Sequence, residues 1–230
     1  MTTVESVVLS LGGSVLIKDE KPDTAYIRAL SKILIDLSSK RKLYVVTGGG
    51  KTARNYIAAG RDLGADESYL DEMGIEVTRL NARLMIIALG ERAFHTPPAN
   101  YDEALLAARN HSIVVMGGVS PGITTDAVSA MLAERAKAKL VVNATSVDGA
   151  YTEDPKKNPQ AKMIPRMSHS ELVALVSVTP PGAGPSTVFD PVGARVLERA
   201  KIVLSIVDGR DLENLRGAIE GKAFKGTLVK

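Results

Sequence analysis

Glycine-rich turns follow short apolar runs at four places in this sequence, and this arrangement is suited to binding phosphate. Glycine permits a positive φ and a close backbone approach, so neighbouring amide N–H groups can point at one anion. A helix that begins at such a turn adds the partial positive charge of its N-terminus. We therefore interpret these turns as parts of one phosphate-binding site: Ser10–Ser14, Thr47–Lys51, Met116–Asp126 and Thr145–Gly149.

The second turn distinguishes between kinds of phosphate site. Gly50–Thr52 resembles the end of a Walker A loop, but that loop needs a glycine where this chain has Val45. Gly48–Ala53 fits the Gly-x-Gly-x-x-Gly/Ala dinucleotide fingerprint, whose acidic partner ends a strand about 20 residues later. The acidic residues near that distance, from Asp66 to Asp71, fall in a helical pattern. A nicotinamide enzyme is therefore the second choice.

Residues for most other catalytic chemistries are missing from the sequence. The chain has no cysteine, which excludes disulfides, thiolate metal sites and cysteine nucleophiles. Its three histidines, His95, His111 and His169, are scattered, and we expect them at the surface or in helix caps and not on a metal. Binding of phosphate by glycine-rich turns needs none of these groups, because backbone amides and helix N-termini supply the contacts.

Composition indicates a single globular domain. The chain has 230 residues, a formal charge of +3, 24% charged residues and 45% apolar residues. The basic residues are not clustered as in nucleic-acid-binding proteins, and the small excess of positive charge suits a small anionic substrate. No apolar run reaches the roughly 18 residues of a membrane span, and Met1–Glu5 lacks the basic start of a signal peptide. We expect a cytoplasmic protein that binds neither nucleic acid nor membrane.

The elements around the turns alternate between short apolar runs and helical patterns, which predicts an α/β fold with a mainly parallel sheet. In such a sheet all four turns gather at the carboxyl edge, where open α/β folds bind ligands. We expect strands at Val4–Leu11, Leu43–Thr47, Ser112–Met116, Leu140–Ala144 and Ile202–Val207. We expect helices at Thr24–Ser39, Lys51–Leu63, Leu70–Glu91, Thr125–Lys137, Ser170–Val176 and Pro191–Ala200.

Local signals define some of the boundaries. Asp23, Ser168 and Asp190 precede helical patterns and are predicted N-caps. Phe94–Asn100 and Val178–Ser186 contain several prolines and are predicted to be irregular. The second of these segments is either a lid over a site or a surface connection.

The longest predicted helix carries an apolar stripe at spacings of four and three residues. The stripe consists of Met73, Val77, Leu80, Leu84 and Ile87. This spacing predicts one buried face packed on the protein's own sheet. A contact between subunits is the alternative.

Five segments in order carry a more specific resemblance: Val46–Arg54, Asp71–Asn81, Val115–Ala127, Val147–Pro155 and Val188–Pro191. In these segments the chain resembles the amino-acid kinase family, and within it the archaeal-type uridylate kinases. The resemblance extends over essentially the whole length, from Leu11–Ser14 to Gly226–Thr227. Several motifs at family-like spacing are far more specific than one glycine turn.

The resemblance implies a three-layer αβα sandwich around a mainly parallel central sheet of about eight strands. It implies one domain over residues 1–230, with the acceptor mainly on the N-terminal half and ATP mainly on the C-terminal half. The implied activity is Mg²⁺-dependent transfer of the γ-phosphoryl group of ATP to UMP, giving UDP and ADP for pyrimidine nucleotide biosynthesis. The implied assembly is a homohexamer, a trimer of dimers, with the long helix near the dimer contact.

Residue by residue, the resemblance implies three groups of contacts. For the ATP phosphates they are Ser10, Leu11, Gly12, Gly13, Ser14, Gly50 and Arg54. For the adenosine they are Thr145, Ser146, Tyr151 and Asp154. For UMP they are Gly49, Asp71, Val119, Ser120, Pro121, Gly122, Ile123, Thr124 and Thr125. Asp71, at the start of the expected long helix, would accept hydrogen bonds from ribose hydroxyls, cap the helix, or do both.

Two residues are catalytic candidates, and two depart from the family pattern. Asp190 would orient Mg²⁺ or the reacting phosphates, or would act only as a helix cap. Ser10 stands where much of the family has a first-strand lysine, although archaeal-type sequences commonly lack it. We hypothesise that Lys51 or Arg54, with Mg²⁺, supplies the missing positive charge. Ser146 stands where the family usually has asparagine, which shortens a hydrogen-bonding side chain.

Other functions remain open at this point. Within the same fold the acceptor could be acetylglutamate, carbamate, aspartate or isopentenyl phosphate. A different class is a non-catalytic protein that binds nucleotides or stores oxyanions. The segment at Asp71 and the run from Gly117 to Asp126 match the nucleotide branch better.

Overall fold

A computed structural model describes residues 5–153, 158, 160–177 and 188–230. The predicted adenosine contact Asp154 and the predicted irregular segment Val178–Ser186 lie outside these ranges.

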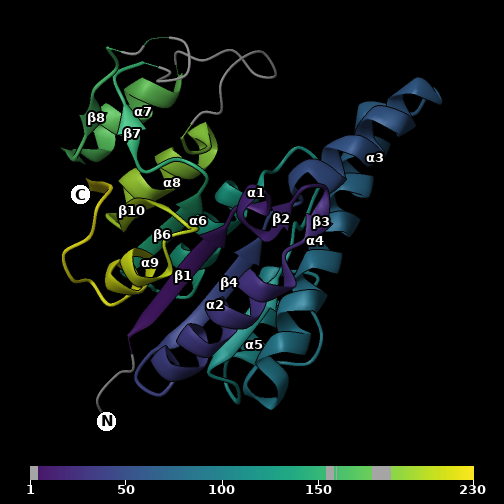
Figure 1. The fold of residues 1–230 in the computed structure, drawn as a ribbon, viewed down its shortest axis with the longest axis horizontal. Coiled ribbons are helices and arrows are strands. Elements are labelled where there is room, and N and C mark those ends of the chain that lie inside the picture. Colours follow the sequence, from purple (N-terminus) through teal and green to yellow (C-terminus); the bar gives the residue numbers. More distant parts are fainter. Residues whose placement is uncertain (1–4, 154–157, 159, 178–187) are drawn as a thin grey trace.

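A seven-stranded sheet forms the centre of the molecule, with the order β5-β4-β1-β6-β10-β11-β9 (Figure 1). Its strands are β1 (Ser6–Leu11), β4 (Lys42–Thr47), β5 (Ile113–Met116), β6 (Leu140–Thr145), β9 (Arg166–Met167), β10 (Val203–Asp208) and β11 (Thr227–Val229). The first five strands of that order are parallel, whereas β11 runs antiparallel to β10. The predicted mainly parallel sheet is confirmed, with seven strands where about eight were expected.

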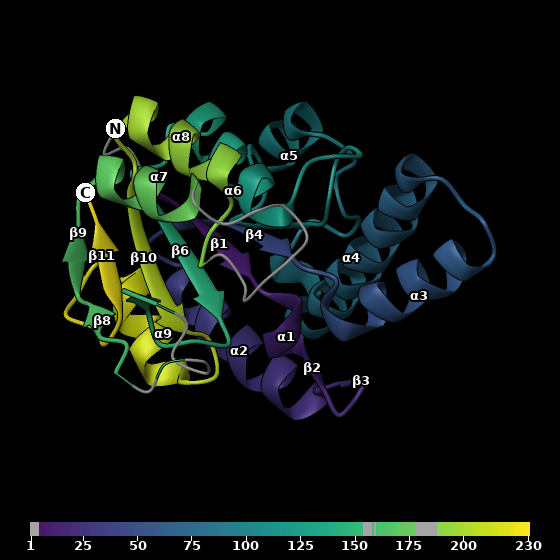
Figure 2. The same ribbon diagram turned by 90° about the horizontal axis from the view of Figure 1, so that it is seen from above.

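Helices cover both faces of the sheet, which gives the expected three layers (Figure 2). One face carries α2 (Thr24–Leu37), α4 (Glu67–Leu89) and α9 (Leu212–Ile219). The other face carries α5 (Tyr101–Ala107), α6 (Thr125–Arg135), α7 (His169–Ser177) and α8 (Pro191–Ala200). The shorter pieces are α1 (Gly13–Leu16), the 3₁₀ turn Gly90–Arg92, and the hairpins β2–β3 (Ile17–Lys18 and Lys21–Pro22) and β7–β8 (Ala150–Tyr151 and Met163–Ile164).

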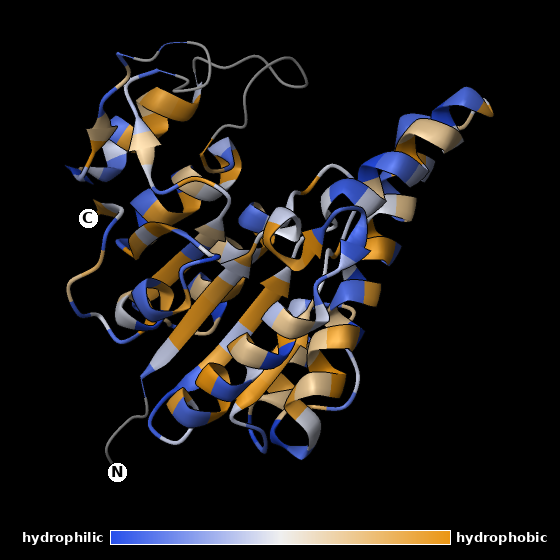
Figure 3. Ribbon diagram, in the orientation of Figure 1, coloured by the Kyte–Doolittle hydropathy of each residue, from blue (hydrophilic) through white to orange (hydrophobic). Residues whose placement is uncertain are grey.

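The central strands are apolar because both of their faces are covered. In β1, Val7 and Leu9 pack into the core on the α2 and α4 side, whereas Val8 packs into the core on the α6 and α8 side. This alternation is the two-residue period of a strand. Figure 3 shows β1 and β4 as largely hydrophobic arrows, with pale or hydrophilic bands between the orange stretches.

Side-chain caps begin the helices where the sequence predicts them. The Asp23 carboxylate accepts from the Tyr26 amide at 3.0 Å, and the Asp190 carboxylate accepts from the Gly193 amide at 2.8 Å. Ser168 Oγ accepts from the Glu171 amide at 3.2 Å. All three predicted N-caps are confirmed.

The long helix α4 corrects one prediction. Within the apolar stripe only Val77 is buried, while Leu80 and Ile87 are 58% and 76% exposed. The face toward the rest of the fold is rotated from the stripe and includes the polar residues Thr78 and Asn81. Most of this face is apolar, with Val77, Met85 and Leu89 among its buried residues, so the predicted stripe was wrong because it followed a neighbouring set of apolar positions.

Helices α3 (Gly50–Asp62) and α4 form an antiparallel pair that extends beyond the sheet (Figure 1). Elsewhere, the elements α5, α9, β9 and β11 were not predicted, because they are short and follow proline-rich or polar segments. Within the described ranges, no helix is both long and apolar enough to cross a membrane.

Candidate functional site

Strand register brings the glycine turns to one edge of the sheet, as predicted. The last residue of β1, Leu11, pairs with Thr47 on one side and with Ala144 on the other. The last residue of β10, Asp208, pairs with Thr145. The carboxyl ends of these parallel strands are therefore neighbours, and the turns that follow them lie along the same edge of the sheet.

The first two turns touch through their backbones. A Cβ on Gly13 would lie 2.0 Å from the Gly50 nitrogen, and a Cβ on Gly48 would lie 2.7 Å from the Gly13 nitrogen. Gly50 has a φ of +65°, which favours glycine. Helices α1 and α3 start at these turns. The predicted contacts from Ser10 to Ser14 and at Gly50 therefore lie beside two helix starts.

Two cations lie in the first turns of α3. The Lys51 ammonium forms an ion pair with Glu20 at 2.5 Å, and both side chains are more than half exposed. Glu20 lies at the tip of the β2–β3 hairpin and has a φ of +68°. Arg54 is exposed on the same helix. The hairpin thus faces the start of α3 and holds one of the two predicted cations.

A loop between β5 and α6 lies opposite α4. The Gly122 amide donates to Asp71 Oδ2 at 2.7 Å, so the loop and the predicted ribose-binding carboxylate are in contact. Helix α4 begins at Glu67 and is capped by Asp66. Asp71 is therefore not an N-cap, and that alternative is wrong.

The same loop holds the other predicted UMP residues: Val119, Ser120, Pro121, Ile123, Thr124 and Thr125. Thr124 caps α6, because its hydroxyl oxygen accepts from the Ala127 amide at 3.2 Å. Gly49 lies across from this loop, at the N-cap of α3.

Asp126 is a site residue that the residue assignments omitted. Ser10 Oγ donates to Asp126 Oδ1 at 2.7 Å, which ties the end of β1 to the start of α6. Burial raises the pKa of Asp126 to about 6; the Ser10 hydrogen bond lowers that pKa, and the negative charge of Asp190 raises it. Two carboxylates therefore lie near each other between the first turn and the acceptor loop. The sequence Thr-Thr-Asp at the end of the third glycine turn could have indicated Asp126, because it places a carboxylate beside the two threonines predicted to bind UMP.

A hollow of about 280 Å³ lies beside the fourth turn. It contains the predicted adenosine contacts Ser146 and Tyr151, and Thr145 lies next to them in the chain. The other lining residues are Val147, Asp148, Asp208, Arg210, Asp211, Asn214 and Lys225.

Ion pairs and hydrogen bonds hold the walls of this hollow together. The Tyr151 hydroxyl donates to Asp148 Oδ1 at 2.7 Å, and this bond is the main cause of the lowered pKa of Asp148. The Lys225 ammonium lies 3.1 Å from Asp148 Oδ2, and Arg210 donates to the Ser146 carbonyl at 2.9 Å. Arg210 follows the carboxyl end of β10, close to where a strand was predicted, whereas the sequence carried no signal for Lys225, which lies just before the antiparallel strand β11.

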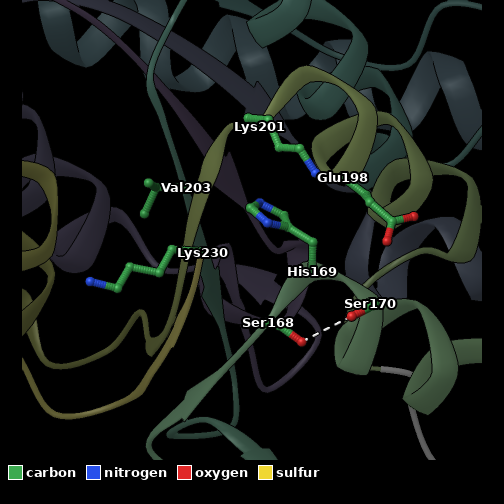
Figure 4. Close-up of a pocket in the computed structure, with 7 residues that line it drawn as sticks. All are labelled: Ser168, His169, Ser170, Glu198, Lys201, Val203 and Lys230. Carbon is green, nitrogen blue, oxygen red and sulfur yellow. Dashed lines mark hydrogen bonds between the residues drawn. The ribbon is translucent and has the colours of Figure 1, made fainter.

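A second hollow, of about 330 Å³, lies at the opposite edge of the sheet, where β10 begins and β11 ends (Figure 4). Its wall includes His169, which is only 8% exposed and bonds through Nε2 to the Ile202 carbonyl at 2.8 Å. His169 is the first residue of α7, next to the cap Ser168, and its ring is buried against the start of β10; of the predicted surface or cap positions, the surface one is therefore wrong for this histidine. This hollow is remote from the glycine turns.

Known proteins share both the sequence and the fold. The amino acid kinase family model matches residues 5–208. The chain is 47% identical to a uridylate kinase of Methanospirillum hungatei, over 97% of this chain and 94% of that protein. It is 47% identical to a uridylate kinase of Methanosarcina mazei, over 97% of this chain and 95% of that protein.

Solved structures agree with this similarity. The crystal structure of uridylate kinase from Archaeoglobus fulgidus matches with a TM-score of 0.88 and 42% identity, over 97% of this chain and 99% of that one. The UMP kinase from Ureaplasma parvum, at 21% identity and a TM-score of 0.79, has the same fold. With a family match over most of its length and its glycine turns in contact at one sheet edge, this chain belongs to the amino acid kinase family.

Proposed function

We propose that this protein transfers the γ-phosphoryl group of ATP to UMP, giving UDP and ADP. The observation that carries the proposal is the near full-length similarity to proteins named uridylate kinases. The acceptor loop and the glycine turns face each other at the carboxyl edge, which supports a reaction between two phosphorylated substrates.

ATP would bind across the glycine turns and the hollow of about 280 Å³. Its phosphates would lie on the turns at Gly12–Ser14 and Gly50, where α1 and α3 begin. Backbone amides and helix N-termini favour such anions. Its nucleoside would enter the hollow near Ser146 and Tyr151. The nucleoside of the donor would thus lie on the C-terminal half of the domain, while its phosphates would lie on turns of the N-terminal half.

UMP would bind between α4 and the loop at residues 119–125. Asp71 uses Oδ2 to hold the Gly122 amide, and its second carboxylate oxygen is an acceptor for a ribose hydroxyl. Thr124 and Thr125 stand at the start of α6, where a helix N-terminus attracts phosphate. Asp71 therefore both fixes the loop and contacts the nucleoside.

In the reaction, an oxygen of the UMP phosphate attacks the γ-phosphorus of ATP. The bond from that phosphorus to the β–γ bridging oxygen breaks, and ADP leaves with its electron pair. Protein groups act by positioning the phosphates and stabilising their charge. Lys51 and Arg54, on the helix that starts at the glycine turn, are the proposed sources of positive charge.

The carboxylates of Asp126 and Asp190 fit the ligand chemistry of Mg²⁺. Carboxylate oxygens are the protein ligands that Mg²⁺ prefers, and it usually takes one or two of them together with phosphate oxygens. Asp190 and Asp126 supply such oxygens at the starts of α8 and α6. When bound, Mg²⁺ would neutralise charge on the phosphates. Asp190 also caps α8, so its two interpretations are compatible.

We also propose that the protein is a homo-oligomer, a hexamer built from dimers. The exposed apolar side chains of Leu80 and Ile87 on α4 support a contact between copies at this helix.

A direct product assay tests the proposed reaction. The purified protein would be incubated with ATP, UMP and Mg²⁺, and the nucleotides separated by chromatography. We expect UDP and ADP to form in equal amounts. Neither product should form when EDTA is present from the start. ADP formed without UDP, or no turnover of UMP, would contradict the proposal.

A further inference from the structure

The inner face of α4 holds Gly118, at the start of the acceptor loop, through the two peptide groups that flank this residue. Thr78 Oγ1 accepts a hydrogen bond from the Gly118 amide at 2.7 Å. The neighbouring residue, Arg79, donates from Nε to the Gly118 carbonyl at 3.2 Å. Gly118 directly precedes the run Val119–Thr125, which the proposed function assigns to UMP. The start of that loop is therefore fixed by two consecutive residues of one helix.

The next residues of α4 hold the triple-glycine turn. Asn81 Nδ2 donates to the Gly48 carbonyl at 2.8 Å, and Thr47 Oγ1 donates to the Thr78 carbonyl at 2.9 Å. Thr78 and Asn81 are only 7% and 4% exposed, so the hydrogen bonds to these loops are made by buried polar groups. One turn of α4 thus contacts the acceptor loop and the phosphate turn together.

The contact leaves no space between helix and loop. A Cβ on Gly117 would lie 2.4 Å from Thr78 Oγ1 and 2.7 Å from the Arg79 nitrogen. The loop backbone therefore follows any shift of α4 directly. Phosphoryl transfer is sensitive to such shifts, because a misplacement of about 1 Å can cost on the order of 100-fold in rate.

We propose that Thr78 and Asn81 are positioning residues, which set the distance between the bound acceptor and the phosphate turn from one turn of α4. Thr78 fixes the acceptor loop through Gly118, and Asn81 fixes the phosphate turn through Gly48. The proposal rests on the proposed function for the identity of the acceptor. The two residues act through the loops and need not touch a substrate themselves.

Thr78→Val tests the first half, because it keeps the shape of the side chain and removes the acceptor for the Gly118 amide. We expect the KM for UMP to rise about tenfold, as for an unpaired buried amide, and the KM for ATP to change less than twofold. Thr78→Ser restores the hydroxyl and should restore the KM for UMP. Asn81→Leu should lower kcat about tenfold, because the turn shared by both substrates is displaced.

Ser31→Ala is the matched control, because it removes a buried helix hydroxyl that bonds the Ile27 carbonyl in α2, away from the loops. Thermal unfolding of every variant is measured beside the kinetics. If Thr78→Val does not fold, Arg79→Met tests the same residue, Gly118, through its carbonyl group and should raise the KM for UMP selectively.

The proposal is overturned if Thr78→Val behaves like the control, with a lower Tm and an unchanged KM for UMP, or if it raises both KM values equally. Wild-type protein that phosphorylates another acceptor and not UMP removes the proposed function only. The same comparison is then made with the KM for that acceptor, and a selective rise would still support the positioning role.

Discussion

Ser10 and Asp126 determine how charge is distributed at the centre of the site. Where a first-strand lysine would place a cation beside this carboxyl group, Ser10 supplies only a hydroxyl donor at 2.7 Å. Burial then raises the pKa of Asp126 to about 6, and the charge of Asp190 adds to this effect. The folded protein therefore holds a proton on Asp126 at pH values where an unfolded chain has released it.

The raised pKa of Asp126 predicts that the free energy of unfolding depends on pH. The folded-state pKa of Asp126 is about 6 against an ordinary 3.8, so the folded state binds more protons between these values and stability falls as pH rises through them. Asp126→Asn keeps an acceptor for Ser10 without the titration. We expect the variant to gain up to about 3 kcal/mol relative to wild type between pH 4 and pH 7. Urea unfolding of both proteins at each pH measures this, and a difference that stays constant with pH would contradict it.

The positive charge of Lys51 is expected to contribute to turnover. Its ammonium group is the proposed replacement for the missing first-strand lysine, alone or with Arg54. We expect Lys51→Met or Arg54→Met to lower kcat at saturating substrates by about tenfold or more, which corresponds to about 1.4 kcal/mol of lost transition-state stabilisation.

Arg61→Met is the control, because Arg61 lies in the last turn of the same helix and pairs with Glu67 at 3.0 Å. Steady-state turnover of the three variants decides the matter. Wild-type turnover in both Lys51→Met and Arg54→Met would sink the hypothesis.

The glycine turns pack against each other, in addition to their proposed role in phosphate binding. The Gly13 and Gly50 backbones lie in contact, so α1 and α3 start from one shared point. Neither turn can take a side chain at these positions without moving the other.

Gly13→Ala should therefore displace the turns. Its Cβ would lie 2.0 Å from the Gly50 nitrogen, a distance that real structures do not permit. We expect loss of ATP binding in calorimetry and a lower Tm. Gly74→Ala is the control within a helix, where the added Cβ meets only the flexible Ile57 side chain at 3.2 Å. Gly13→Ala protein that binds ATP like wild type would show that the turns are not packed as described.

Much of this element arrangement could be predicted from the sequence. Apolar runs that end in glycine define buried parallel strands with open carboxyl ends, so the position of the site followed from local pattern. The buried face of α4 did not follow, because the helix also carries apolar side chains such as Leu80 and Ile87 on its exposed side, and the burial of Thr78 and Asn81 depends on distant loops. Lys225 was equally unpredictable, since an antiparallel return through β11 brings it to Asp148.

At the scale of the whole molecule, α4 carries the exposed apolar side chains of Leu80 and Ile87. Leu80 and Ile87 are seven residues apart and share one face of α4. We expect Leu80→Asp combined with Ile87→Asp to reduce the mass measured by light scattering from that of an oligomer to that of a smaller species. Leu106→Asp, an exposed leucine on α5, is the control. An unchanged mass in the double variant would contradict a contact at this face.

The proposed function depends on which acceptor the site selects. The decisive measurement is kcat/KM for a panel of acceptors with ATP and Mg²⁺: UMP, CMP, dUMP, AMP, GMP, acetylglutamate, carbamate, aspartate and isopentenyl phosphate. We expect the highest kcat/KM for UMP, with only weak turnover of dUMP or CMP. A higher value for any of the small acids or for isopentenyl phosphate, or binding of ATP without turnover of any acceptor, would contradict it.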